Sequence, residues 1–147
     1  MNRKKHAFTL LELLIVVTIL GIIAATVGVQ IGKAGNDARD NTIKSTLQTL
    51  RSQIELFKFH HNGQAPDLGN NDAQYWVIML GKSNTSDIVN PVATGIYGPY
   101  LRAAPANPVN RLTTLGAAPN PNVGWVYSST DGSIKAVSTN GTTCIAY

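Results

Sequence analysis

Glu12 is the only charged residue between positions 8 and 32, and the side chains around it are mostly apolar. A carboxylate in such a setting costs about 2.5–3.5 kcal/mol on membrane-insertion scales, so it needs a partner. The partial positive charge of a helix N-terminus offsets only about 0.3–1 kcal/mol of this cost. A full positive charge would serve better, and we expect Glu12 to act by pairing with a cationic group.

The other residues that could do chemistry form no recognisable site. His60 and His61 are adjacent, so on a helix they point about 100° apart and cannot chelate one metal ion together. We expect them to form a solvated helix end, and we expect no metal site. Cys144 is the only cysteine, which excludes an intramolecular disulfide and predicts a packed or exposed thiol. The sequence has no Gly-x-Ser-x-Gly, phosphate-binding loop or His-Glu-x-x-His, and it does not predict an enzyme.

The excess of basic residues is concentrated at the N-terminus. The chain has 12 Lys and Arg against 8 Asp and Glu, but Arg3, Lys4 and Lys5 lie in the leader. From Phe8 onward, nine basic residues face eight acidic ones. Such a balanced surface gives no electrostatic footprint for nucleic acid.

An uncharged stretch of 20 residues follows Glu12, at positions 13–32. A helix of that length, at about 1.5 Å per residue, matches the ~30 Å hydrocarbon core of a bilayer. The basic leader keeps its own end cytoplasmic, so the rest of the chain is exported. One alternative is a cleaved secretory signal, but the apolar core of such a signal is shorter than the stretch found here. The other alternative is a plain single-pass anchor. We predict a transmembrane and assembly helix at residues 8–32.

The second half of the same helical spine, at residues 33–62, is predicted to be amphipathic. Asn62-Gly63 is a C-cap signal and Pro66 follows, so we expect the helix to end near His61. Its apolar stripe lasts only about two heptads, which favours a helix that covers a small sheet over a coiled coil. The stripe has spacings of 4, 3, 4 and 3 and comprises Ile43, Leu47, Leu50, Ile54 and Phe57.

Residues 63–147 are predicted to form a small exported domain. A short helix is expected at Asp72–Leu80, capped by Asn71 or Asp72, and residues 82–123 are rich in loops. Asp131-Gly132 between residues 124–128 and 133–137 predicts a β-hairpin, with Trp125 and Tyr127 on one face. The short helix would bury Trp76, Val77, Met79 and Leu80.

These elements together predict an α+β fold. Its long N-terminal helical spine has a membrane half and an amphipathic half. The spine packs on a small C-terminal antiparallel sheet with a loop-rich insert.

Residues 7–14, Ala-Phe-Thr-Leu-Leu-Glu-Leu-Leu, resemble the N-terminal signature of type IV prepilins and type II secretion pseudopilins. The resemblance implies that the leader, residues 1–7, is removed between Ala7 and Phe8 and that Phe8 is then N-methylated. The family has Gly before the cut, where this chain has Ala7. The resemblance also implies that Glu12 pairs in the filament with the α-amino group of a neighbouring subunit's Phe8. The alternative is a Glu12 at headgroup level without a specific partner.

Residues 57–66 and 98–105 are similar to segments of the major, G-type, pseudopilins. Many of those proteins bind calcium through carboxylates and carbonyls of a later loop. After residue 87 this chain has one acidic residue, Asp131, which we expect to serve the turn. A hard cation needs several anionic oxygens, so calcium is disfavoured and no cofactor is expected. Type IV major pilins close their C-terminal region with a disulfide, which one cysteine cannot form.

The resemblance therefore implies a structural subunit of a type II secretion pseudopilus. Its expected place is the inner membrane, with a cytoplasmic N-terminus and a periplasmic C-terminal domain. Expected partners are other copies of the chain, the prepilin peptidase/methyltransferase and secretion-platform proteins. A type IV pilus or competence pilin for adhesion, motility or DNA uptake is the alternative, but the tail lacks a basic patch for DNA. Assembly is expected through Glu12 and through Leu13, Val16, Val17, Leu20, Ile23 and Val27.

Overall fold

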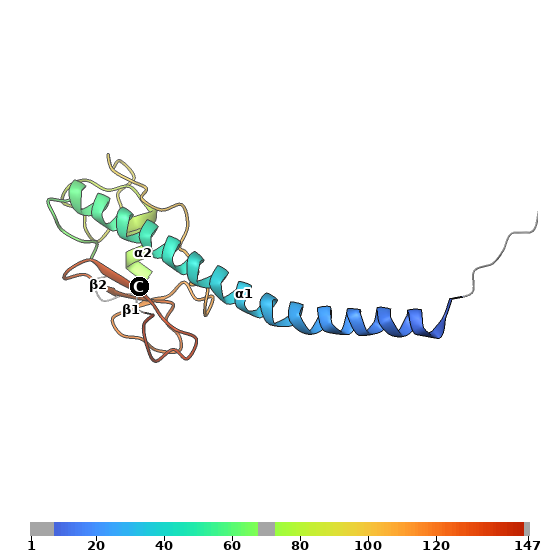
Figure 1. The fold of residues 1–147 in the computed structure, drawn as a ribbon. Coiled ribbons are helices and arrows are strands. Elements are labelled where there is room, and N and C mark those ends of the chain that lie inside the picture. The colour runs from blue at the N-terminus through green and yellow to red at the C-terminus, as the bar shows by residue number, and fades with distance from the viewer. Residues whose placement is uncertain (1–7, 68–72, 146–147) are drawn as a thin grey trace, which may run out of the picture. The chain divides into compact units, whose positions relative to one another are not determined.

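The computed structural model describes residues 8–67 and 73–145, with their side chains except at 26–34 and 73–75. The described residues contain the elements α1, α2, β1, β2 and β3 in chain order (Figure 1). The chain divides into two compact units, Met1–Ala38 and Arg39–Tyr147. Helix α1 spans Leu10–His60 and contributes to both units.

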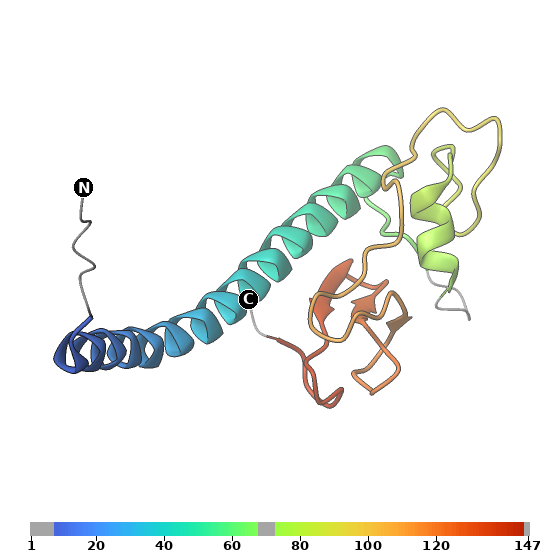
Figure 2. The ribbon, with the colours of Figure 1, turned by 90° about the vertical axis from the view of Figure 1, so that its right-hand side faces the viewer.

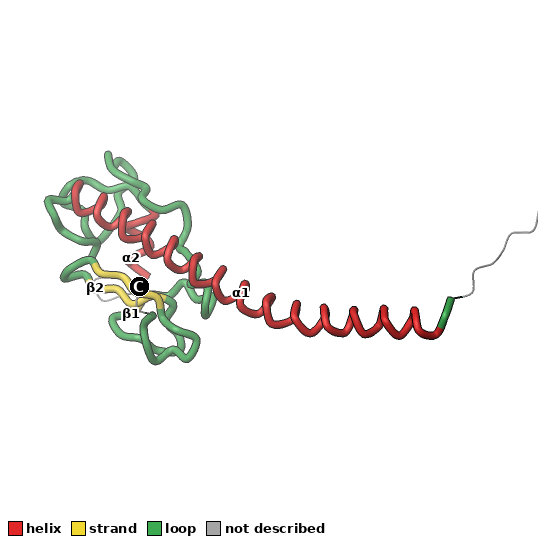
Figure 3. The backbone as a smooth tube through the Cα atoms, in the orientation of Figure 1, coloured by secondary structure: helices red, strands yellow, loops and turns green. Residues whose placement is uncertain are grey.

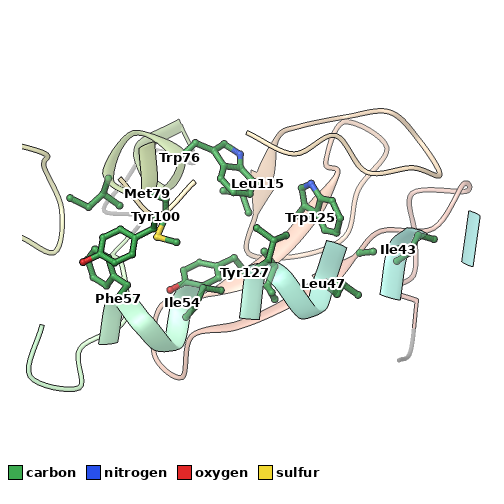
Figure 4. Packing of buried hydrophobic residues seen from close by; sticks show 14 residues of the cluster. Ile43, Leu47, Ile54, Phe57, Trp76, Met79, Tyr100, Leu115, Trp125 and Tyr127 are labelled. Carbon is green, nitrogen blue, oxygen red and sulfur yellow. The ribbon is translucent and has the colours of Figure 1, made fainter. Parts of the chain in front are cut away.

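The second unit holds the hydrophobic core. The predicted apolar stripe of α1 is confirmed, because each of its five side chains is at most 1% exposed. Figure 4 shows Ile54 of α1 beside Tyr127 of the sheet, and both belong to the buried cluster that also contains Leu47 and Trp125. Helix α1 therefore covers the sheet, as the length of the stripe predicted.

The end of α1 is fixed by two residues with left-handed backbone conformation. Asn62 has φ 56° and Gly63 has φ 83°. The Gly63 N–H donates to the carbonyl of Lys58, five residues earlier, at 2.7 Å. This is the 6→1 hydrogen bond of a Schellman cap. The predicted helix end near His61 is confirmed, since α1 ends at His60.

Strands β2 (Trp125–Ser128) and β3 (Ser133–Ala136) form the predicted antiparallel hairpin. Trp125 pairs with Ala136 and Tyr127 with Ile134, and all four side chains are at most 1% exposed. The turn contains Gly132 at φ 75°, a conformation that a glycine adopts without strain. The hairpin thus presents one apolar face to α1.

The prediction of a purely antiparallel sheet is wrong at one edge. Strand β1 (Leu115–Gly116) pairs with β2 in parallel, and the strand order is β1-β2-β3. A strand of two residues leaves no alternating pattern in the sequence. Its position depends instead on a distant contact, in which the Thr114 carbonyl accepts hydrogen bonds from the Gly124 and Trp125 N–H groups.

Helix α2 spans Ala73–Leu80, and the predicted caps Asn71 and Asp72 lie outside the described residues. Trp76 and Met79 are buried as predicted, but Val77 is 44% exposed and Ile78 is buried instead. The buried arc passes through Trp76, Met79 and Ile78, which leaves Val77 on the opposite side of the helix.

Loops fill most of the chain between α2 and β1, as predicted (Figure 3). They lie beside the end of α1 and the hairpin within the second unit (Figure 2). They are nevertheless held in place. The Tyr100 and Leu101 N–H groups both donate to the Met79 carbonyl at 2.9 Å, and the Trp76 indole donates to the Thr113 carbonyl.

Candidate processing and assembly segment

Phe8 and Thr9 precede the first residue of α1. Phe8 is 70% exposed and has no regular secondary structure. The Thr9 hydroxyl oxygen accepts a hydrogen bond from the Glu12 N–H at 3.2 Å, and the Thr9 carbonyl accepts from the same group at 3.1 Å. The residue predicted to carry the N-methyl group therefore lies just outside the helix. Ala7 and the rest of the leader lie outside the described residues, so the cleavage position stays a prediction.

Glu12 lies in the first turn of α1, where its backbone N–H is capped and its side chain is exposed. Among the described residues, no ion pair reaches its carboxylate. The Glu12 side chain is therefore an exposed carboxylate in the first helical turn, without an ion-pair partner among the described residues. Its predicted pairing with a neighbouring subunit's amine needs a second copy and stays a prediction.

The helix around Glu12 presents apolar side chains to its surroundings on every side. Twelve large apolar residues from Phe8 to Ile23 are between 44% and 85% exposed. Contiguous apolar surface of this kind marks a protein or membrane interaction site. Of the predicted assembly residues, Leu13, Val16, Val17, Leu20 and Ile23 are in this set, and the side chain of Val27 lies outside the described residues.

Among the described residues, no helix combines the length and the apolarity that a membrane span requires. The transmembrane helix at residues 8–32 stays a prediction.

His61 contradicts the prediction of a solvated helix end. The side chain is 0% exposed, and its ring stacks on Phe57 with centroids 3.7 Å apart. Its Nδ1 lies 2.7 Å from the Phe57 carbonyl and its Nε2 lies 3.0 Å from the Ser83 hydroxyl. A serine beside an imidazole could form a nucleophile and base pair. Because Ser83 is also 0% exposed, substrate has no access, and the pair fastens a loop to α1.

His60 makes a second contact between the helix end and the same loops. Its ring stacks on Tyr97 at 4.3 Å, and its Nδ1 lies 3.0 Å from the Tyr100 hydroxyl. Burial raises the pKa of Tyr100. Sequence reasoning missed both histidine contacts because the partners are 22 and 40 residues away, in loops without a periodic pattern.

Two surface hollows lie among the described residues of the second unit. One, of about 320 Å³, is lined along α1 by Lys44, Leu47, Gln48, Arg51 and Ser52. The other, of about 340 Å³, lies where the chain after α1 meets the hairpin turn. Neither hollow brings a nucleophile together with a histidine. Among the described side chains, no three His, Cys, Asp or Glu residues are placed to share a metal ion.

Asp131 serves the hairpin turn, as predicted. Its carboxylate accepts the Ser133 N–H at 3.0 Å. This hydrogen bond, with others from Ser128 and Ser133, lowers the pKa of Asp131 to about 2. The exclusion of calcium is not tested by this arrangement and stays a prediction.

Residues 2–28 match the family model of the prokaryotic N-terminal methylation motif. No curated protein and no solved structure matches the chain. The matched residues include Ala7, Phe8 and Glu12, so the chain has a type IV prepilin-like N-terminus, which indicates a structural subunit. The match ends before the segments at 57–66 and 98–105, and it does not support the narrower assignment to the major pseudopilins.

Proposed function

We propose that this chain is a structural subunit of a type II secretion pseudopilus. A peptidase/methyltransferase removes residues 1–7 and N-methylates Phe8, and the mature chain then assembles through α1. One observation carries the proposal: the methylation motif at residues 2–28 coincides with a helix that exposes its apolar side chains and one carboxylate.

Glu12 sets the register of this assembly. Cleavage before Phe8 creates an α-amino group, which is a cation of the kind that a carboxylate in an apolar environment needs. Exchange of lipid contacts for subunit contacts would leave Glu12 in an even drier setting. A subunit whose carboxylate does not meet a neighbour's amine then has an unpaired charge, so misaligned subunits are rejected.

The proposed location follows from the same segment. The basic leader stays in the cytoplasm, the apolar segment lies in the inner membrane, and the second unit lies in the periplasm. Partners are other copies, the processing enzyme and proteins of the secretion platform.

Mass spectrometry of the mature N-terminus tests whether the chain is processed as a prepilin-like protein. The expected product begins with N-methylated Phe8. A chain in the membrane fraction that retains Met1 would contradict processing and reduce the protein to a plain anchor.

Glu12→Gln tests assembly separately from processing and insertion. The substitution removes the charge and leaves a side chain of similar size, so we expect normal membrane insertion. We expect at least tenfold less filament, because a loss of about 1.4 kcal/mol in each contact between subunits lowers the association constant tenfold. Filament yield by shearing and electron microscopy is the measurement. Glu55→Gln is the matched control, since Glu55 is exposed and contacts only Lys58 among the described ion pairs.

A type IV pilus or competence subunit is the second candidate, because the N-terminal motif itself is compatible with both machines. Two observations on the sequence favour the pseudopilus, namely the single Cys144 and the sparse basic residues of the tail. Deletion of the chain distinguishes them. Loss of protein secretion with pili retained supports the pseudopilus, and loss of pili or DNA uptake supports the alternative.

A further inference from the structure

Thr9 lies between the predicted cleavage bond and the start of α1. Its hydroxyl and carbonyl oxygens both accept from the Glu12 N–H, and its carbonyl also accepts from the Leu13 N–H at 3.3 Å. These contacts make Thr9 the N-cap residue, with Glu12 at the third helical position. Threonine followed three residues later by glutamate is the sequence signature of a capping box.

The chain before Thr9 would not stop a helix by composition. Arg3, Lys4, Lys5 and Ala7 have high helix propensity, and Asn2, His6 and Phe8 rank lower without being helix breakers. The leader also contains no Gly or Pro. Thr9 is thus the residue whose side chain ends the helix at this point.

A helix that continued backwards would obstruct the processing enzyme. The carbonyl of residue 7 would accept a hydrogen bond from the N–H of residue 11, as in any α-helical turn. Hydrolysis requires water to add to that carbonyl carbon, after which the bond to the Phe8 nitrogen breaks and the nitrogen takes up a proton. A peptide bond inside a helical turn is shielded from that attack.

We infer that Thr9 is a positioning residue for leader removal, whose cap starts α1 at Leu10 so that the helix does not extend over the bond that the peptidase cleaves. The inference rests on the proposed function, because it presupposes cleavage before Phe8. The Thr9 side chain would thus act in the precursor, during removal of the leader and before assembly.

Three substitutions test this role in the full-length precursor in membranes, with the prepilin peptidase of the same cell. Thr9→Val keeps the shape and removes the hydroxyl, whereas Thr9→Ser and Thr9→Asn keep a capping oxygen. We expect Thr9→Val to be cleaved about fivefold more slowly, the factor that corresponds to loss of a typical N-cap, and the other two variants to be cleaved at nearly the wild-type rate. Pulse–chase conversion to the chain that starts at Phe8 is the measurement.

Thr18→Val is the matched control. Its hydroxyl bonds the Ile15 carbonyl within the same apolar helix, at 2.8 Å, and caps nothing. Wild-type cleavage of Thr9→Val overturns the inference, as does equally slow cleavage of Thr18→Val. Slow cleavage of Thr9→Asn with normal cleavage of Thr9→Ser also overturns it, because the enzyme then reads the hydroxyl directly. A wild-type chain that keeps Met1 contradicts the proposed function itself, whereas the other outcomes leave it standing.

Discussion

At the scale of single residues, Asn107 is a buried amide that joins three segments of the second unit. Its side-chain nitrogen donates to the Gly124 carbonyl at 2.7 Å and to the Val137 carbonyl at 2.8 Å. Its side-chain oxygen accepts the Val109 N–H at 2.9 Å. Because the residue is 0% exposed, water cannot replace any of these bonds.

Asn107→Asp should therefore destabilise the second unit strongly. The substitution replaces the side-chain NH2 group, which donates to two carbonyl oxygens, by a carboxylate oxygen that those carbonyls repel. We expect the free energy of unfolding to fall by about 3 kcal/mol at neutral pH. Urea unfolding of the detergent-solubilised chain, followed by tryptophan fluorescence, measures the loss.

The control for this substitution is Asn120→Asp. Asn120 is exposed, and its side-chain oxygen accepts the Asn122 N–H, which a carboxylate also can do. We expect a change within about 0.5 kcal/mol. The penalty at position 107 should shrink as the pH falls, since burial raises the pKa of the introduced carboxyl and protonation then removes its charge. A pH-independent loss would contradict the electrostatic explanation.

The role of Asp131 could be predicted because its signal is local, a glycine that follows it in the sequence. Glu12 is also conspicuous locally, because its surroundings are apolar over a continuous stretch, and its role in assembly stays a prediction. Asn107 and His61 gave no such signal. Each also has a partner 17 or more residues away, and only the folded loops determine the position of that partner.

At the scale of elements, the charge state of one carboxylate, Asp131, contributes to the stability of the β2–β3 hairpin turn. The hydrogen bonds to Asp131 lower its pKa from 3.8 to about 2 in the folded chain. A lowered folded pKa means that the carboxylate stabilises the fold above its ordinary pKa. This contribution is lost as the pH falls from about 4 towards 2.

Asp131→Asn should make stability less dependent on pH in that window. The amide oxygen can still accept the Ser133 N–H, so the turn is kept while titration is removed. We expect the urea midpoint of the wild type to fall more steeply between pH 4 and pH 2 than that of the variant. The matched control is Asp40→Asn, which removes an exposed carboxylate from α1 and leaves the hairpin turn unchanged. If the urea midpoints of the wild type and of Asp131→Asn change equally with pH, the Asp131 carboxylate does not contribute to stability in this pH range.

The boundaries of elements followed from residues with special backbone conformation. Asn62 and Gly63 end α1, and Gly132 completes the hairpin turn, all at positive φ. Strand β1 has no such marker, and its two residues contribute too little pattern for prediction.

At the scale of the whole molecule, the core of the second unit uses only residues from Ile43 onward. A fragment of residues 39–147 should therefore fold and unfold cooperatively, with the urea midpoint of the full chain. Trp76 and Trp125 are buried, so tryptophan fluorescence reports the transition.

A shorter fragment provides the contrast. Residues 49–147 lack Ile43 and Leu47, each of which is at most 1% exposed, and losing one such side chain typically costs about 2–5 kcal/mol. We expect no cooperative transition in this fragment. An unfolded 39–147 fragment would mean that the second unit needs the N-terminal residues to fold.

The α+β class was predictable because helical and alternating periods occur in separate parts of the chain. The parallel edge pair and the course of residues 81–114 were not predictable, since these loops are fixed by hydrogen bonds between distant backbone groups. The prepilin-like N-terminus could be predicted, because its motif lies within one short stretch of the sequence and needs no distant contact.

The short strand β1 has a consequence for the filament that we propose. An exposed sheet edge can recruit a strand from another copy and lead to aggregation. Here one edge is only two residues long, and the strand at the other edge has Lys135 as its exposed side chain. Neither edge is a good template for strand addition. In the proposed filament, copies of this chain would therefore lie close together without their sheets pairing, and assembly through the helix would meet no competition from the sheet edges.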